Sequence, residues 1–243
     1  MGIFSYLKSS ILSKIVMAVT GVMLVGYILI HTAGNMLIYA GADAINSYSE
    51  FLHSLGPILW IARIILLLAL ILHIWTSIVL RISNNDANPQ KYAVKRYIKA
   101  KLTSRTMLWT GIAVFLFVVY HVSHLTLHVT NPEHVAKQLY IPHGVYFASN
   151  TGASFAIART DVFRMVVLGF QNPIISICYI IAVTIVGFHL NHAIQSMFQT
   201  LGLNHPKYFP TIQKTSVALS FIITLSLISI PVSVMLKLIG GNL

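Results

Sequence analysis

Residues 57–80 read PILWIARIILLLALILHIWTSIVL, and this stretch decides the class of fold. It holds a single charged residue, Arg63, in 24 positions. A helix of that length is about 36 Å long, which is more than the roughly 30 Å hydrocarbon core of a bilayer. Four more apolar runs of comparable length lie at residues 15–39, 106–129, 172–197 and 214–238. The sequence therefore predicts an all-α integral membrane bundle of five transmembrane helices.

The composition of the chain indicates the same class. Hydrophobic residues make up 56% of the 243 positions and charged residues 9%, whereas roughly a quarter of the residues in soluble domains are charged. Because the five runs use most of the chain, we expect residues 1–243 to form one transmembrane domain. The first run follows Lys8 and Lys14, as in a signal peptide, but it exceeds the roughly 7–15 apolar residues of such a peptide. We expect it to be a retained helix.

The positive charge of the chain indicates its orientation. A formal charge of +11 would suit a nucleic-acid-binding protein if the charges shared one soluble surface. Instead, eleven of the 16 lysines and arginines lie before the first run, between the second and third, and between the fourth and fifth: Lys8, Lys14, Arg81, Lys91, Lys95, Arg96, Lys99, Lys101, Arg105, Lys207 and Lys214. Cytoplasmic loops are rich in Lys and Arg, so the sequence predicts an inside N-terminus and an outside C-terminus. It predicts contact with membrane lipid and no nucleic-acid partner.

Eleven histidines are many for so apolar a chain, because an ionisable side chain inside a bilayer is costly and usually functional. Two of them share one depth when counted from the inside boundary. His31 is 17 residues past Lys14, and His121 is 16 residues past Arg105. At 1.5 Å per residue both lie about 25 Å across the membrane, near its outer face. We call His31 and His121 the outer pair.

Two other histidines share a second depth when counted from the outside boundary. His73 is 16 residues past Pro57, and His189 is 16 residues past Pro173. Both runs are predicted to travel inward, so these side chains lie about 24 Å from the outer boundary, near the inner face. We call His73 and His189 the inner pair.

Each pair draws one histidine from each of two helices, which is the arrangement that clamps a flat macrocycle by two imidazole ligands in a bundle core. The sequence therefore predicts two haems. The single cysteine, Cys178, excludes a thiolate cluster within the chain, so a metal would be held by histidine. Small residues near the pairs would let a porphyrin approach the helices: Gly26, Gly34, Gly111 and Gly187.

Other histidines compete for the ligand role, and any single intramembrane histidine could instead bridge two helices by a hydrogen bond. His124 and His192 each lie three residues from a paired histidine, and we interpret them as neighbours of the ligands or of the haem propionates. His128 would lie too far out. Solvated or interfacial roles are expected for the histidines in connections: His53, His134, His143 and His205.

Four stretches around the paired histidines resemble the di-haem cytochrome b membrane anchors of succinate:quinone oxidoreductases, the succinate dehydrogenase and fumarate reductase complexes. They are SKIVMAVTGVMLVGYILIHTAGN (13–35), LLLALILHIWTSIVL (66–80), SRTMLWTGIAVFLFVVYHVSH (104–124) and FQNPIISICYIIAVTIVGFHLNHAIQSMFQTLGLNHPKY (170–208). The last two are the most specific, and the resemblance covers nearly the whole chain. It implies that His31, His73, His121 and His189 are the axial ligands of two haems b. One departure is Ala193, where the family pattern has glycine.

The resemblance implies an electron-transfer subunit in the prokaryotic cytoplasmic membrane. Electrons would pass between an iron–sulfur subunit and a quinone, by resemblance menaquinone, while the dicarboxylate chemistry would occur on a flavoprotein subunit. The chain has no nucleotide-binding glycine motif and no cysteine cluster, which agrees with those centres lying on partner chains. The basic segment 81–105 would dock these partners or contact anionic lipid.

Quinone reduction takes up protons, and Glu50 is the candidate for their transfer beside the outer pair, with His53 second. An ordinary polar position in the connection is the alternative for both residues. Ser104 and Arg105 could pair with haem propionates, or Arg105 could only mark the membrane boundary.

Two other functions remain open at this point. A cytochrome b subunit of a hydrogenase or formate dehydrogenase would keep the haems and change the partner. A proton-coupled transporter with histidine relays would need no haem, because intramembrane titratable groups also serve transport.

Overall fold

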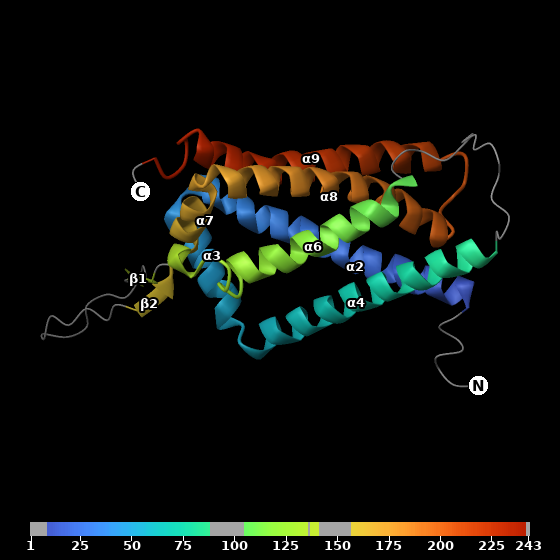
Figure 1. Cartoon of the computed structure of the whole chain (residues 1–243), viewed down its shortest axis with the longest axis horizontal. Coiled ribbons are helices and arrows are strands. Elements are labelled where there is room, and N and C mark those ends of the chain that lie inside the picture. The colour runs from blue at the N-terminus through green and yellow to red at the C-terminus, as the bar shows by residue number, and fades with distance from the viewer. Residues whose placement is uncertain (1–8, 88–104, 136, 141–156, 242–243) are drawn as a thin grey trace, which may run out of the picture.

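The computed structural model describes residues 9–87, 105–135, 137–140 and 157–241. Five helices in this part are long and apolar enough to cross a membrane (Figure 1). They are α2 (Ser10–Met36), α4 (Pro57–Asp86), α6 (Met107–Leu125), α8 (Pro173–Thr200) and α9 (Phe209–Met235). The predicted bundle of five transmembrane helices is therefore confirmed.

The helix bounds differ from the predicted runs at polar ends. α4 continues to Asp86 and α9 begins at Phe209, both beyond the apolar runs. An apolar run marks only the part of a helix that lies in hydrocarbon, so such extensions are expected where water can satisfy the backbone. α6 instead ends early, at Leu125, and His128 follows in a left-handed backbone conformation with φ of 56°.

Short elements fill the first and third connections, for which the sequence predicts no helix or strand. They are η1 (Leu37–Ala40), α3 (Ala42–Ser54), η2 (Pro132–His134), α7 (Val162–Gln171) and a two-stranded antiparallel ribbon of β1 (Lys137–Tyr140) and β2 (Ile157–Thr160). All of them gather at one end of the bundle, which we call the α3 end (Figure 1). α9 finishes at the α3 end and α2 begins at the opposite end, as an odd number of spans requires.

Local sequence explains where these helices begin. Gly56 adopts a positive φ of 52°, and Pro57 then occupies the first turn of α4, where its missing N–H costs no hydrogen bond. Asn172 precedes Pro173 and caps α8 through its side chain, whose oxygen accepts from the Ile174 N–H at 3.0 Å.

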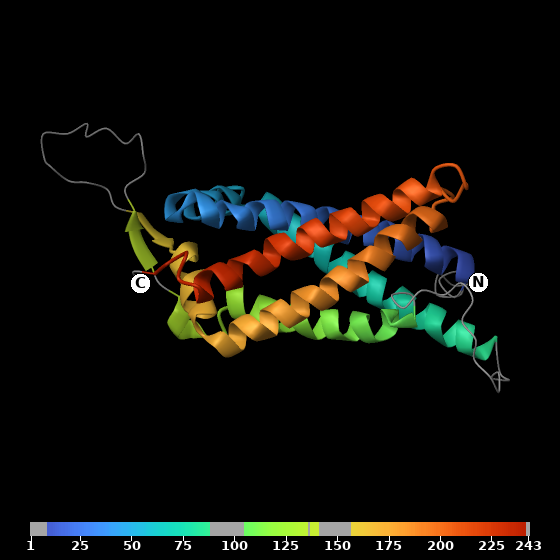
Figure 2. The same cartoon turned by 90° about the horizontal axis from the view of Figure 1, so that it is seen from above.

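The long helices pack as neighbours, and a small buried apolar cluster joins α2, α8 and α9 through Val25, Leu190, Ile194 and Ile223. α8 and α9 run side by side, α2 contacts α4, α8 and α9, and α6 packs against α8 (Figures 1 and 2). Large apolar side chains face outward along the bundle, among them Ile30, Trp109 and Ile174. Such surfaces suit contact with lipid tails and would be a liability in water.

A compact core fixes the α3 end. Ile38, Val167, Phe170, Tyr179 and Val234 pack there, joining the short elements to α8 and α9. This core brings the short elements over the end of the bundle that carries the outer pair. It thereby supplies the site with neighbours that do not belong to the membrane spans.

A buried polar junction adds to this core and joins α3 to the start of α7. The Asn46 amide donates to Asp161 Oδ1 at 3.0 Å, and Asn46 Oδ1 accepts from the Phe163 N–H at the same distance. Asp161 also caps α7 by accepting from the Arg164 N–H. Both side chains are buried, so each needs the other as a partner.

Candidate functional site

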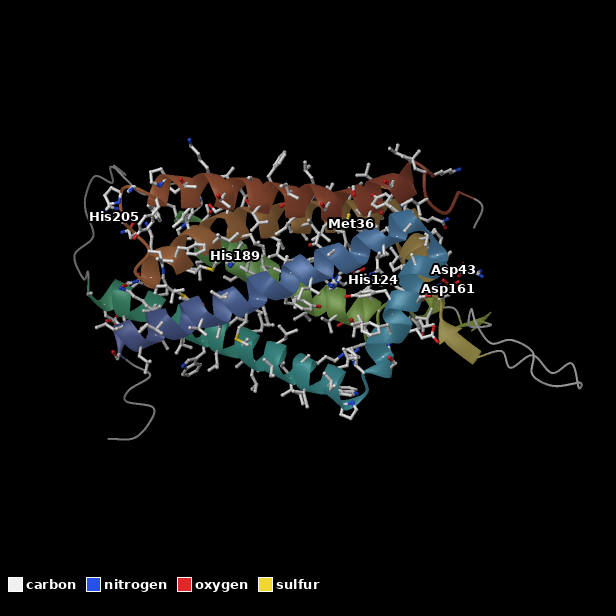
Figure 3. All side chains as sticks on the ribbon, turned by 180° about the vertical axis from the view of Figure 1, so that it is seen from behind. Met36, Asp43, His124, Asp161, His189 and His205 are labelled. Atoms are coloured by element: carbon white, nitrogen blue, oxygen red, sulfur yellow. The ribbon has the colours of Figure 1, made fainter. Side chains whose placement is uncertain are left out.

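The histidines of the bundle occupy two levels along its axis. In Figure 3, His189 lies nearer the end that carries His205, whereas His124 lies nearer the α3 end, which carries Asp161. Helix α2 gives the spacing, because Thr20 contacts His73 and precedes His31 by 11 residues. At 1.5 Å per residue the two levels lie about 16 Å apart along the axis.

The outer pair meets across helices α2 and α6. The ring centroids of His31 and His121 are 5.7 Å apart, with ring planes at 84°. Metal–imidazole bonds of about 2 Å would put two such centroids about 6 Å apart on one metal ion. His31 Nδ1 lies 3.5 Å from the Tyr27 hydroxyl. His121 Nδ1 is the only buried side-chain polar atom of the described residues without a hydrogen-bond partner, so this ring has unused bonding capacity.

The inner pair is held from the neighbouring helices. His73 Nδ1 lies 3.2 Å from the Thr20 hydroxyl of α2, and His189 Nδ1 lies 3.1 Å from the Thr110 hydroxyl of α6. Thr20 and Thr110 each precede a histidine of the outer pair by 11 residues. His73 of α4 and His189 of α8 therefore lie at a common level of the bundle, and their ligation of one haem stays a prediction.

These residues fit a haem better than a metal bound by protein alone. Within the described ranges no group of three or more His, Cys, Asp or Glu side chains could hold a metal ion. A haem brings four porphyrin nitrogens and needs only two axial ligands from the protein. Two half-buried histidine pairs, one with an unsatisfied nitrogen, meet that need at two levels.

His124 has protein partners for both ring nitrogens. Its Nδ1 is 3.0 Å from the Tyr179 hydroxyl, and its Nε2 is 3.3 Å from His134 Nδ1. The side chain is only 1% exposed. His124 thus lies beside the outer pair without a free nitrogen for a metal, which agrees with the neighbouring role expected for it. Tyr179 completes the contact, since its ring packs against His121 at 5.9 Å between centroids.

His134 differs from its expected solvated or interfacial role. It reaches back from η2 to His124, and Gly169 of α7 makes room for that contact. A Cβ at position 169 would lie 3.2 Å from His124 Cε1. Beside it, the Asn131 amide donates to Glu133 Oε1 at 3.1 Å and lowers the pKa of that carboxyl group. Sequence position alone could not show that the chain after α6 folds back onto the helix.

Two of the glycines expected near a porphyrin serve helix packing instead. A Cβ at Gly34 would lie 2.6 Å from Tyr48 Cε1 of α3, and a Cβ at Gly187 would collide with Thr224 of α9. Gly111 lies against the His189 ring, and Gly26 has no atom within 4 Å of the Cβ position. Small residues thus mark positions where another group packs closely on a helix, but the sequence alone does not identify that group.

The remaining candidates are placed as follows. Glu50 is half-buried on α3, whereas His53 is exposed on the same helix, with Nδ1 2.8 Å from its own helix carbonyl at Ser49. His192 is half-buried one turn beyond His189. Arg105 precedes α6 and is exposed. Ser104, His143 and positions 88–104 of the basic segment lie outside the described residues.

Sequence reasoning missed Thr20, Thr110 and Tyr179 among the residues that contact the histidines. The two threonines carried a signal, since each is followed by glycine and stands 11 residues before a histidine of the outer pair. Comparisons of the chain with family models, curated proteins and solved structures find no match.

Proposed function

We propose that this chain is the membrane anchor and electron-transfer subunit of a succinate dehydrogenase or fumarate reductase, with two haems b. The observation that carries the proposal is the pairing of four intramembrane histidines at two levels. The ring centroids of His31 and His121 are 5.7 Å apart, and His73 and His189 contact Thr20 and Thr110 at the second level. The choice of succinate and fumarate rests on the four sequence stretches that resemble such anchors.

In this proposal His73 and His189 hold the inner haem, and His31 and His121 hold the outer one. Bound haem would supply a one-electron iron centre at each level. The histidines act as neutral imidazole ligands, and the surrounding helices keep water from the bundle interior. The levels lie about 16 Å apart along the axis, so both fit within the roughly 30 Å hydrocarbon core.

The chain would work as the quinone-reactive part of a larger enzyme in the prokaryotic cytoplasmic membrane. A flavoprotein subunit would carry the dicarboxylate chemistry, and an iron–sulfur subunit would exchange electrons with the inner level. Reduction of a quinone, by resemblance menaquinone, takes up two electrons and two protons. Glu50 is half-buried on α3 at the α3 end, where it could pass protons to a quinone beside the outer pair.

The direct test is the haem content of the purified chain. A pyridine haemochrome assay should find two haems b per chain, and the oxidised spectrum should be that of low-spin iron with two nitrogen ligands. One haem per chain would remove one of the two pairs from the proposal. A chain without haem would leave a proton-coupled transporter with intramembrane histidines as the better explanation.

Co-purification separates the proposed anchor from other quinone-linked cytochromes b. A mild-detergent preparation should retain a flavoprotein and an iron–sulfur protein, and it should reduce a quinone with succinate. A hydrogenase or formate dehydrogenase partner would keep the haem assignment and overturn the proposed complex.

A further inference from the structure

Helices α2 and α6 carry the same residue pattern. Thr20 and Gly21 precede His31 on α2, and Thr110 and Gly111 precede His121 on α6, with 11 residues from threonine to histidine in both helices. Eleven residues are close to three helical turns, so threonine and histidine lie on nearly the same side of each helix. Each of these helices thus supplies one histidine to the outer pair and one threonine to the inner level.

The hydroxyl of Thr20 has only one proton, and the backbone of α2 takes it. Thr20 Oγ1 lies 2.8 Å from the Val16 carbonyl oxygen, which can only accept. The oxygen of the same hydroxyl is therefore left to accept from His73, whose Nδ1 is 3.2 Å away.

Thr110 repeats this arrangement on α6. Its hydroxyl lies 3.1 Å from the Thr106 carbonyl oxygen and 3.1 Å from His189 Nδ1. The glycine after each threonine lies beside the histidine ring: a Cβ would be 3.7 Å from His73 Cε1 at Gly21 and 3.6 Å from His189 Cε1 at Gly111. Both rings of the inner pair are therefore held by the same kind of contact.

We propose that Thr20 and Thr110 are the positioning residues of the inner pair, which hold the Nδ1–H of His73 and His189 and leave each Nε2 as the metal-binding nitrogen. The proposal rests on the haem ligation proposed above and adds to it. A ligating histidine normally donates its second N–H to an acceptor, which fixes the tautomer and strengthens the ligand. The outer pair lacks such a contact at His121, so the threonines distinguish the two levels.

The test is a pair of isosteric substitutions read by spectroscopy and redox potential. Thr20→Val and Thr110→Val each remove the acceptor and keep the side-chain shape. Each variant should shift the EPR g values of the inner haem and raise its midpoint potential, because a weaker imidazole donor stabilises ferric iron less. Retention of the inner haem should fall about tenfold, while the outer haem is unchanged.

Conservative and distant variants provide the controls. Thr20→Ser and Thr110→Ser keep the hydroxyl and should restore the wild-type spectrum and potential. Thr184→Val removes a hydroxyl that bonds only its own helix, 2.7 Å from the Ile180 carbonyl, and should change neither haem. Equal effects of the Ser and Val variants would overturn the proposal, because packing and not hydrogen bonding would then be responsible.

A measurement on the haem-free chain keeps this inference separate from the function proposed above. Solid-state NMR of the ¹⁵N-histidine-labelled chain in lipid should show His73 and His189 as Nδ1–H tautomers in the wild type. Thr20→Val should change the signals of His73 alone. If the chain bound two bis-histidine haems and the Thr→Val variants had wild-type spectra and potentials, only the role of the threonines would be overturned. A chain that binds no haem but shows these tautomers would overturn the function and retain the hydrogen bonds.

Discussion

Replacing His121 by alanine should remove the same spectral component as replacing His31, because the two rings lie 5.7 Å apart and would share one iron. His73→Ala and His189→Ala should remove the other component. Optical and EPR spectra of the four purified variants check this pairing. If His31→Ala and His73→Ala removed one and the same component, the division into two levels would be wrong.

His124→Ala should retain both haems, since both nitrogens of His124 already bond to Tyr179 and His134. The substitution removes the partner of the buried Tyr179 hydroxyl and of the half-buried His134, so we expect a loss of about 1–3 kcal/mol in stability. Haem content and the midpoint of thermal unfolding in detergent measure the two effects separately. Loss of one haem in His124→Ala together with its retention in His121→Ala would move the ligand by one turn of α6.

Counting residues from the membrane boundaries predicted that His31 and His121 come together, because a helix inside a bilayer has a fixed rise per residue. It could not predict the partners of those histidines. The contact of Thr20 with His73 depends on how α2 and α4 are rotated against each other, and residue spacing within one helix does not contain that rotation. The contact of His134 with His124 depends on the chain folding back after α6, and residue spacing does not contain that fold either.

At the scale of elements, α3 and α7 depend on one buried junction. Asp161→Ala should lower stability by about 1–3 kcal/mol, because it removes the cap of α7 and leaves the Asn46 amide buried without its acceptor. Asn172→Ala removes the more exposed cap of α8 and should cost about 1 kcal/mol or less. Thermal unfolding of the two variants in one detergent gives the comparison. Equal losses of stability in the two variants would mean that the Asn46–Asp161 hydrogen bond contributes nothing beyond the helix cap.

Close packing of α3 on α2 gives a second test at this scale. Gly34→Ala places a Cβ 2.6 Å from Tyr48 Cε1, so α3 must shift at a cost of about 1–3 kcal/mol. Gly26→Ala in the same helix meets no atom within 4 Å and should be neutral, or stabilising by up to about 1 kcal/mol. Unfolding midpoints of the haem-free variants provide the measurement. A Gly34→Ala variant as stable as Gly26→Ala would contradict the close contact of α3 with α2.

Apolar runs predicted the five membrane helices because a bilayer demands about 20 apolar residues and internal backbone hydrogen bonds. No comparable demand marks the short elements. Residues 162–171 form a helix of ten residues, VFRMVVLGFQ, which is too short to span and was read as part of a connection. Its position follows from the Asp161 cap and from Val167 and Phe170 in the core of the α3 end. Those contacts are tertiary, so sequence periodicity in one segment did not reveal them.

At the scale of the whole molecule, the arrangement of the five spans fixes which segments share a side. α2 begins at the end of the bundle opposite α3, and α9 finishes at the α3 end (Figure 1). The side that faces the cytoplasm is predicted from charge. Eleven of the 16 lysines and arginines were assigned to the inside segments, which places the α3 end outside.

Reporter fusions test this orientation directly. A cytoplasmically active reporter should be active when fused within residues 85–100, and a periplasmically active one when fused within 135–165. Fusions after Lys8 and after Lys237 serve as controls and should report opposite sides. The reverse pattern would put α3, Glu50 and the outer pair on the cytoplasmic side. The iron–sulfur partner would then dock beside the outer pair, and quinone chemistry would move to the level held by Thr20 and Thr110.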